Sequence, residues 1–306
     1  MSALCSATSL ERAEPMTATA SRVARWLLVE HPGAWGPESV PSRRMAAGAA
    51  RALARTANDA QARLLLIRRS AGQPRTDGRE VYAVDSRPGG EQLWRRHVAD
   101  DAELADLSPP YGVQDPTGWE PLSSPLYLVC THGRHDRCCA LLGRPVAKAL
   151  SQRFAEQTWE CTHIGGDRFA ANVLVLPEGL YLGRIEAAES VRVMDELAAG
   201  LLPAGRVRGR SSQPLPTQAA QQFARQATRR WGVTDLEPVR QQGTGPDTWS
   251  VWLAGPGGPA IEVVVRYDRS GGGEHHLTCD ALSAKPIPMF CQVSLSELPA
   301  DPGPPP

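Results

Sequence analysis

Two cysteine-bearing segments about thirty residues apart constrain this chain more than any other feature. Each segment places thiols, imidazoles and carboxylates at the end of a short apolar strand: Cys130, His132, His135, Asp136, Cys138 and Cys139 in the first, and Cys161, His163 and Asp167 in the second. Scattered cysteines usually fill a core, whereas Cys, His and Asp gathered in two loops beside two buried strands indicate a site. We interpret the pattern as a metal or iron–sulfur site.

Composition narrows the class of protein. The 306 residues carry 33 basic and 33 acidic side chains, so there is no global charge that would favour nucleic acid or an anionic membrane as a partner. No apolar stretch approaches the roughly 18 residues of a membrane span, and charged residues interrupt the first twenty positions. The seven cysteines are an odd number, which disfavours a secreted disulfide framework. We therefore expect a cytoplasmic protein. Its isolated cysteines, Cys5, Cys279 and Cys291, are expected to be structural or incidental.

The first part of the chain predicts an α/β unit. Residues 1–20 lack a clear period and are expected to form a disordered lead-in. In residues 21–115, apolar runs alternate with an Ala- and Arg-rich segment that favours a helix over 45–62. This strand–helix–strand order indicates a partly parallel sheet. No internal repeat is visible.

The central part, residues 120–204, predicts a thioredoxin-like domain. A strand over 126–129 is followed by a long loop to residue 143 and a helix over 145–154, with Pro145 in its first turn. The remaining elements are expected as strands at 158–163, 172–177 and 180–185 and a helix at 189–202. In this order of elements, the loop after the first strand carries the chemistry.

The last part predicts a smaller module. Residues 205–216 are basic and rich in Gly and Pro, which is typical of a linker, and Arg206, Arg208 and Arg210 are expected to be solvated there. Residues 217–295 follow with a helix and several strands, and residues 296–306 form a Pro-rich tail. The predicted fold class is thus α/β (α+β), with the thioredoxin-like domain between the first unit and a small α+β module.

The residues alone leave the ligand set open. Cys130 and Cys139 are separated by eight residues, a loose spacing that can curl around a cluster. The second segment must supply the other ligands, from Cys161, His163 and Asp167. Carboxylate is a harder ligand than thiolate and is uncommon on iron–sulfur clusters, so the chemistry of the donors favours Cys161 over Asp167 as a ligand.

Several motifs together resemble the sucrase/ferredoxin-like family. They are Cys130-Thr-His132 with Asp136-Arg-Cys138-Cys139, the run from His163 to Asn172, the run from Val175 to Arg184, and the segment from Trp26 to Gly36. The resemblance extends over roughly residues 22–290. It implies a thioredoxin-like ferredoxin domain in which two Cys and two His of a His-x-x-x-His segment hold a [2Fe-2S] cluster. Cys130, Cys139 and His163 match three of those ligands, and Asp167 occupies the position of the second His.

The sequence therefore predicts an electron-transfer protein, a redox carrier for a partner protein rather than an enzyme with its own substrate. Its [2Fe-2S] cluster would be bound by Cys130, Cys139, His163 and either Asp167 or Cys161. Two alternatives remain. A zinc-stabilised binding module would use the same donors in a tetrahedral site. A metal-free thiol oxidoreductase would use Cys138 and Cys139, although no Cys-x-x-Cys is present.

Overall fold

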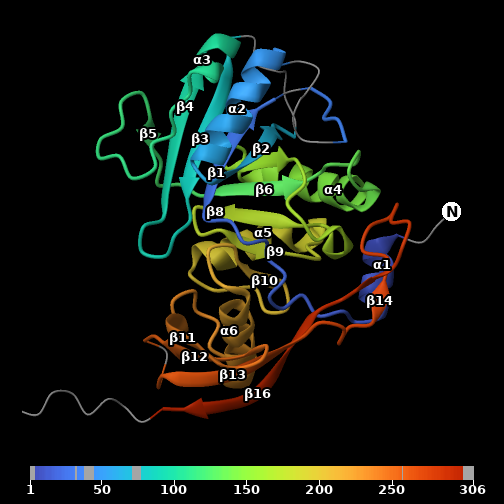
Figure 1. Ribbon diagram of the computed structural model, residues 1–306. Helices are drawn as coiled ribbons and strands as arrows, with labels where there is room; N and C mark the ends of the chain where they lie inside the picture. The colour runs from blue at the N-terminus through green and yellow to red at the C-terminus, as the bar shows by residue number, and fades with distance from the viewer. Residues whose placement is uncertain (1–3, 32, 38–44, 71–76, 257, 299–306) are drawn as a thin grey trace, which may run out of the picture.

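One ten-stranded mixed sheet organises most of the molecule (Figure 1). A computed structural model of the protein describes residues 4–298, apart from residues 32, 38–44, 71–76 and 257. The strand order is β10-β9-β8-β6-β7-β2-β1-β3-β4-β5. The sheet twists so far that β3 and β4 run upright in Figure 1, whereas β6 and β8 run across the view. The expected mixed α/β class is confirmed.

The second unit has the predicted thioredoxin-like order. Its elements are β6 (Leu126–Cys130), α4 (Arg137–Arg153), β7 (Thr158–Cys161), β8 (Val173–Leu176), β9 (Leu180–Leu182) and α5 (Ala187–Ala198). Strands β6 and β7 are parallel, β8 is antiparallel to β6, and β9 is antiparallel to β8. All five residues of β6 are buried, as expected for a central strand whose two faces are both covered.

The first unit repeats this topology, although the sequence shows no repeat. Its elements are β1 (Arg25–Glu30), α2 (Ala47–Asp59), β2 (Ala62–Arg68), β3 (Arg79–Asp85), β4 (Gln92–Val98) and α3 (Asp101–Ala105). Again the first two strands are parallel and the next two are added antiparallel, in the order β2-β1-β3-β4. The two units meet where β2 pairs antiparallel with β7, at Ile67 opposite Cys161. A two-residue strand, β5 (Glu120–Pro121), pairs with β4 at the outer edge.

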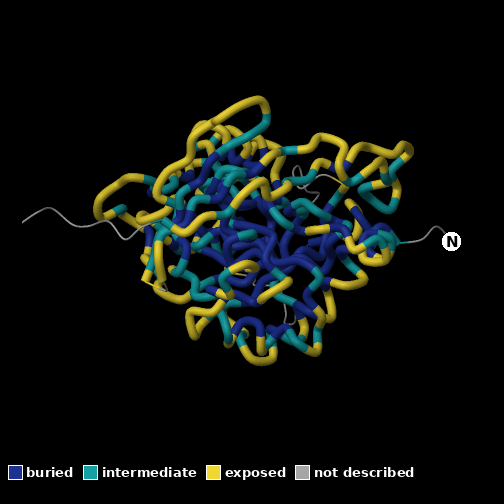
Figure 2. The backbone as a smooth tube through the Cα atoms, turned by 90° about the horizontal axis from the view of Figure 1, so that it is seen from below, coloured by how far each residue is buried: buried dark blue, intermediate teal, exposed yellow. Residues whose placement is uncertain are grey.

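The core follows the alternation of side chains along these strands. One face of the sheet forms a continuous apolar cluster across both units, which includes Leu28, Ile67, Leu128 and Trp159. The other face is covered by α2 in the first unit and by α4 and α5 in the second. Figure 2 shows the buried backbone gathered at the centre, with exposed loops around it.

The expected linker over residues 205–216 is wrong. Residues Val207–Arg210 form β10, the edge strand that pairs with β9, and Arg208 is only 2% exposed. Its guanidinium donates to Gly165 O and Asn172 Oδ1, both at 2.8 Å, and to Thr19 O at 2.6 Å. Buried acceptors rather than water therefore satisfy this cation, which a charge-based interpretation of the sequence does not anticipate.

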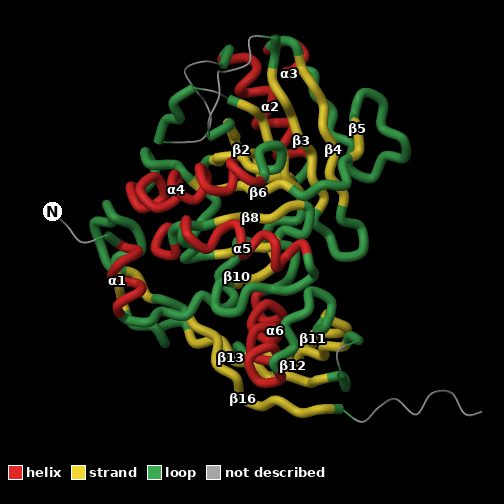
Figure 3. The backbone as a smooth tube through the Cα atoms, turned by 180° about the vertical axis from the view of Figure 1, so that it is seen from behind, coloured by secondary structure: helices red, strands yellow, loops and turns green. Residues whose placement is uncertain are grey.

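The third module packs beyond β10 (Figure 3). Helix α6 (Leu215–Thr228) covers a four-stranded antiparallel sheet of β11 (Glu237–Gly245), β12 (Thr248–Ala254), β13 (Ile261–Asp268) and β16 (Met289–Glu297). The chain between β13 and β16 includes β14 (Glu274–His275) and β15 (Lys285–Pro286). We call residues 269–288 the C-terminal arm; in Figure 1 it extends from the module to the N-terminal helix. The predicted tail lies, from residue 299 onward, outside the described residues.

The expected disordered lead-in is also wrong for residues 4–20. Helix α1 (Cys5–Glu11) is followed by Glu14, which is 4% exposed and accepts hydrogen bonds from Arg168 Nε at 2.6 Å and Ser9 Oγ at 2.9 Å. Burial would raise the pKa of Glu14, but its partners Arg168, Ser9 and Arg12 together outweigh burial and hold the pKa below its ordinary value of 4.5. Arg184 adds a hydrogen bond of 2.8 Å to Glu14 O. Buried charge pairing therefore holds this segment in place.

We predict that Glu14→Gln lowers the free energy of unfolding by about 2 kcal/mol near neutral pH, because it removes the buried ion pair with Arg168. A lowered carboxyl pKa contributes stability above the unfolded-state value of 4.5 and loses it as the pH falls through the folded-state value. The difference between wild type and variant should therefore shrink below about pH 4.5 in thermal unfolding measured across a pH series.

Glu11→Gln is the matched control, since Glu11 is exposed on the same segment. If Glu14→Gln behaves like Glu11→Gln at every pH, the ion pair does not hold the segment.

Candidate metal centre

The first pair of thiols is positioned by β6 and the start of α4. Cys130 is the last residue of β6, and Cys139 lies in the first turn of α4. The predicted loop to residue 143 and the predicted helix start at Pro145 are wrong: α4 begins at Arg137, and Pro145 lies inside it. The reason is the N-cap: Asp136 Oδ1 accepts the backbone N–H of Cys138 at 2.7 Å, and this starts the helix eight residues before Pro145.

A glycine permits the close approach of α4 to β6. A Cβ atom on Gly143 would lie 2.2 Å from the carbonyl oxygen of Cys130 and 3.3 Å from Thr131 Cγ2. Backbone cannot yield to such a contact without moving the helix. Gly143 therefore sets the separation between the segments that carry Cys130 and Cys139.

The second segment turns back on itself after β7. Gly165 and Gly166 have φ values of 100° and 80°, in the left-handed region, and a short 3₁₀ helix, η1 (Asp167–Phe169), follows. A Cβ atom on Gly166 would lie 2.3 Å from the guanidinium of Arg208. This turn brings Asp167 back beside His163.

The two segments converge on one group of donors. Ligand atoms of Cys130, Cys139 and His163 all lie within 4.8 Å of one another. The same holds for His135, His163 and Asp167, so the two sets share His163. The Cys139 thiol donates to Asp167 Oδ1 at 3.0 Å, and His163 Nδ1 lies 3.0 Å from the same oxygen. Among the described residues, His163 Nδ1 has no partner with hydrogen-bond geometry.

The ionisable side chains of this group shift one another's pKa values. The contact with Cys139, and then that with His163, lowers the pKa of Cys130 well below that of an ordinary thiol despite its burial. The pKa of Cys139 is raised, chiefly by the thiolate of Cys130. Burial would lower the pKa of His163, but Asp167 and Cys130 outweigh it and raise the pKa to about 9. A bound metal would therefore displace protons from His163 and Cys139.

Cys161 lies outside both sets of donors. It is opposite Cys130 in the β6–β7 register, is fully buried, and shares the apolar cluster of Cys130 and Cys139. Burial raises its pKa well above that of a free thiol, as is typical of an inert core cysteine. Of the two candidates for a fourth ligand, Asp167 is the one that contacts both Cys139 and His163.

His132 and His135 support the group from two sides. His132 is buried; its Nδ1 accepts the backbone N–H of His163 at 3.2 Å, and its Nε2 lies 2.6 Å from Gly36 O. This pattern fixes the neutral tautomer with the proton on Nε2 and holds the backbone of His163 in place. The His135 ring packs against that of His163, with centroids 3.6 Å apart and the planes tilted by 30°. Arg168 and Arg184 donate to Glu14 and Ser9 and not to this group.

A second group of thiols was not anticipated from the sequence. Cys5, Asp136, Cys138 and Cys279 also place one ligand atom each within 4.8 Å of one another. Cys5 and Cys279, expected to be structural or incidental, thus lie beside Cys138. Only the clustered Cys138 carried a signal in the sequence, because the other two thiols come from segments more than 130 residues away.

Comparison with known proteins supplies the family. The family model described as Sucrase/ferredoxin-like matches residues 16–209, which is more than half of the chain. The chain belongs to the sucrase/ferredoxin-like family. The match contains the whole first group of donors and both units of the large sheet, but it ends before α6, so the expected resemblance out to residue 290 is not found in the third module. No curated protein and no solved structure matches the chain.

The residues of the first group fit a metal. They supply soft sulfur donors, an imidazole nitrogen without a hydrogen bond, and a carboxylate in contact with both. In the described part of the chain, no helix has the length and apolar character required to cross a bilayer.

We predict that Gly143→Ala lowers metal content although it removes no ligand, because the added methyl group must move α4 away from Cys130. Such overpacking should also lower the free energy of unfolding by about 1–3 kcal/mol. Metal analysis and denaturant unfolding measure the two effects.

Gly48→Ala is the control: Gly48 lies in α2, and nothing lies within 4 Å of its Cβ position. That variant should keep its metal and gain up to about 1 kcal/mol from helix propensity. Full metal content in Gly143→Ala would show that the helix position does not control the site.

Proposed function

We propose that this member of the sucrase/ferredoxin-like family is an electron-transfer protein that holds a [2Fe-2S] cluster through Cys130, Cys139, His163 and Asp167. The observation that carries the proposal is the meeting of these four donors, which stand at the positions of the family's ligand motif. Their ligand atoms fall in two overlapping sets that share His163, and Cys139 contacts Asp167. When bound, such a cluster accepts and donates single electrons.

The family pattern is what favours a cluster. The resemblance assigns Cys130, Cys139 and His163 as ligands and leaves Asp167 at the fourth position. The four groups lie close together, since Cys139 Sγ and His163 Nδ1 are each 3.0 Å from Asp167 Oδ1.

The exposure of the donors supports transfer of electrons to a partner protein. Cys130 and Cys139 are each 1% exposed, whereas the side chains of His163 and His135 are 23% and 36% exposed. The imidazole end is therefore the end that reaches the surface. We propose that a redox partner approaches there, while the thiols stay shielded from solvent.

The thiol-oxidoreductase alternative loses support from the geometry. Cys138 and Cys139 are adjacent in α4, but their thiols face different neighbours. Cys139 faces Asp167, whereas Cys138 lies 3.6 Å from Cys5 and 3.1 Å from Cys279. The zinc alternative keeps one favourable observation, since Cys130, Cys139 and His163 by themselves lie within reach of a single ion.

Anaerobic purification followed by a visible spectrum and iron, sulfide and zinc analysis tests the proposal. We expect red-brown protein with about two irons and two sulfides per chain. Cys130→Ala and Cys139→Ala should each lose the colour and the iron, because the cluster would lose a thiolate ligand.

Cys291→Ala is the matched control, since Cys291 is exposed and belongs to neither group of donors, and it should keep both colour and iron. Colourless wild-type protein with zinc at the first group would favour the structural module. Full colour in Cys130→Ala would refute the ligand assignment.

Exchange of the fourth donor gives a second prediction. In Asp167→His a neutral imidazole replaces an anionic carboxylate. The imidazole stabilises the oxidised state of the cluster less than the carboxylate does. The reduction potential should therefore rise by on the order of 100 mV. Protein-film voltammetry or a dye-linked redox titration measures the potential. Cys161→Ala should leave it unchanged; a loss of the cluster in that variant, with none in Asp167→His, would make Cys161 the fourth ligand.

A further inference from the structure

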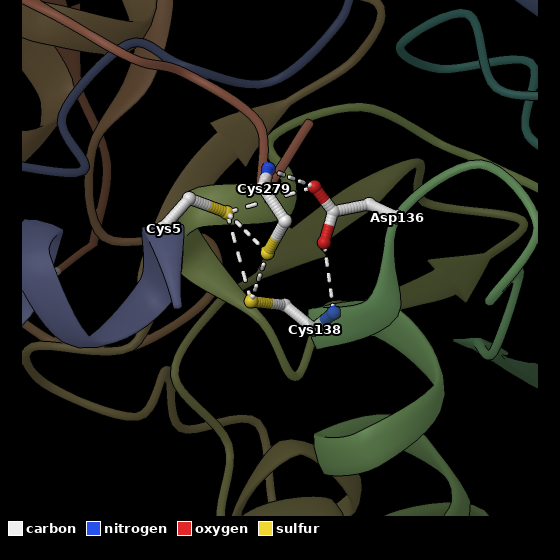
Figure 4. Close-up of side chains that lie close together, drawn as sticks. All are labelled: Cys5, Asp136, Cys138 and Cys279. Atoms are coloured by element: carbon white, nitrogen blue, oxygen red, sulfur yellow. Dashed lines mark hydrogen bonds between the residues drawn. The ribbon is translucent and has the colours of Figure 1, made fainter. Parts of the chain in front are cut away.

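Three thiols from distant parts of the chain meet at the start of α4 (Figure 4). Cys5 comes from α1, Cys138 from the first turn of α4, and Cys279 from the C-terminal arm. Figure 4 shows the three sulfur atoms turned toward one another, with the Asp136 carboxylate beside them. Cys5 and Cys138 are buried, at 3% and 0% exposure.

The sulfur positions match the coordination sphere of one ion. The Sγ–Sγ distances are 3.6 Å for Cys5–Cys138, 3.1 Å for Cys138–Cys279 and 3.7 Å for Cys5–Cys279. Tetrahedral zinc with Zn–S bonds of about 2.3 Å requires sulfur atoms about 3.8 Å apart. These three thiols converge on a single point, which is the arrangement of a mononuclear site.

Asp136 completes the donor set. Its Oδ2 lies 3.7 Å from Cys5 Sγ and accepts the backbone N–H of Cys279 at 2.7 Å. Its Oδ1 accepts the N–H of Cys138 at 2.7 Å. These two hydrogen bonds orient the carboxylate toward the sulfur atoms, and zinc accepts carboxylate oxygen together with thiolates. Ser6 Oγ donates to Cys138 Sγ at 3.2 Å, the kind of outer hydrogen bond that orients a metal-bound thiolate.

We propose that Cys5, Cys138, Cys279 and Asp136 bind one zinc ion, which ties α1 and the C-terminal arm to the start of α4. On binding, three S–H groups release their protons to solvent and Zn–S bonds form, with no change in oxidation state. Cys5 and Cys279 both lie outside residues 16–209, so two of the four donors come from beyond the region that the family model matches. None of the four is a donor of the first group.

Zinc here would stabilise the surroundings of the first group. Cys138 and Cys139 are consecutive residues, so an ion on Cys138 holds the same helical turn that presents Cys139 to Asp167. Structural zinc contributes directly to folding free energy, and here it would join segments 131 to 274 residues apart.

Zinc analysis of the full chain, with a chelator competition titration, tests the proposal. We expect about one tightly bound zinc per chain. It should persist in the double variant Cys130→Ala/His163→Ala, which disables the first group. Cys5→Ser and Cys279→Ser should each raise the zinc Kd at least about tenfold, because each removes a thiolate. Cys291→Ser should bind zinc like wild type.

A second measurement covers the case in which a serine variant fails to fold. Cobalt substitution of wild type should give a sulfur-to-cobalt charge-transfer band of three thiolates. Cys279→His retains a zinc ligand and should bind cobalt with a weaker band.

Three outcomes would overturn the proposal: zinc binding unaffected by Cys5→Ser and Cys279→Ser, no zinc in wild type, or a Cys138–Cys279 disulfide detected by mass spectrometry in anaerobically prepared protein. Iron-free protein that keeps this zinc contradicts the cluster alone, and protein with a cluster but no zinc contradicts this site alone.

Discussion

The hydrogen bond from the backbone N–H of Cys138 to Asp136 fixes where α4 begins, and the positions of both thiol groups depend on it. A helix that began at Pro145 would leave Cys138 and Cys139 in a loop without defined directions. Begun at Arg137, the first turn directs consecutive thiols to opposite neighbours, Cys138 to Cys5 and Cys139 to Asp167. One capping interaction thus separates two chemical environments within a single helical turn.

Strand β6 and the Gly165-Gly166 turn both help to position the first turn of α4 and its neighbours. Strand β6 ends at Cys130 beneath it, and Gly143 lets the helix lie directly on the strand. The buried Arg208 holds the Gly165-Gly166 turn through Gly165 O and thereby helps to place Asp167. Strand β10, mistaken for a linker, is therefore part of what shapes the first group.

Sequence reasoning succeeded where the signal was local. Apolar runs revealed the strands of the second unit, and the spacing of Cys130 and Cys139, with the resemblance to a known family, led to His163 and Asp167. It failed where long-range contacts decide the outcome. Nothing near Cys5 or Cys279 in the sequence points to Cys138, and the basic composition around Arg208 conceals that carbonyl oxygens surround this side chain. The repeated topology of the first unit was also hidden, because its copy lacks the cysteines that mark the second.

The antiparallel contact between β2 and β7 has a further consequence. Each of these strands is the outermost strand of its own four-stranded unit, and each covers the exposed backbone groups of the other. An unpaired strand edge is a template for association with other chains. The first unit therefore covers the open strand edge of the unit that carries the candidate metal centre. A chain cut between the two would leave β7, with Cys161 at its end, free to pair with copies of itself.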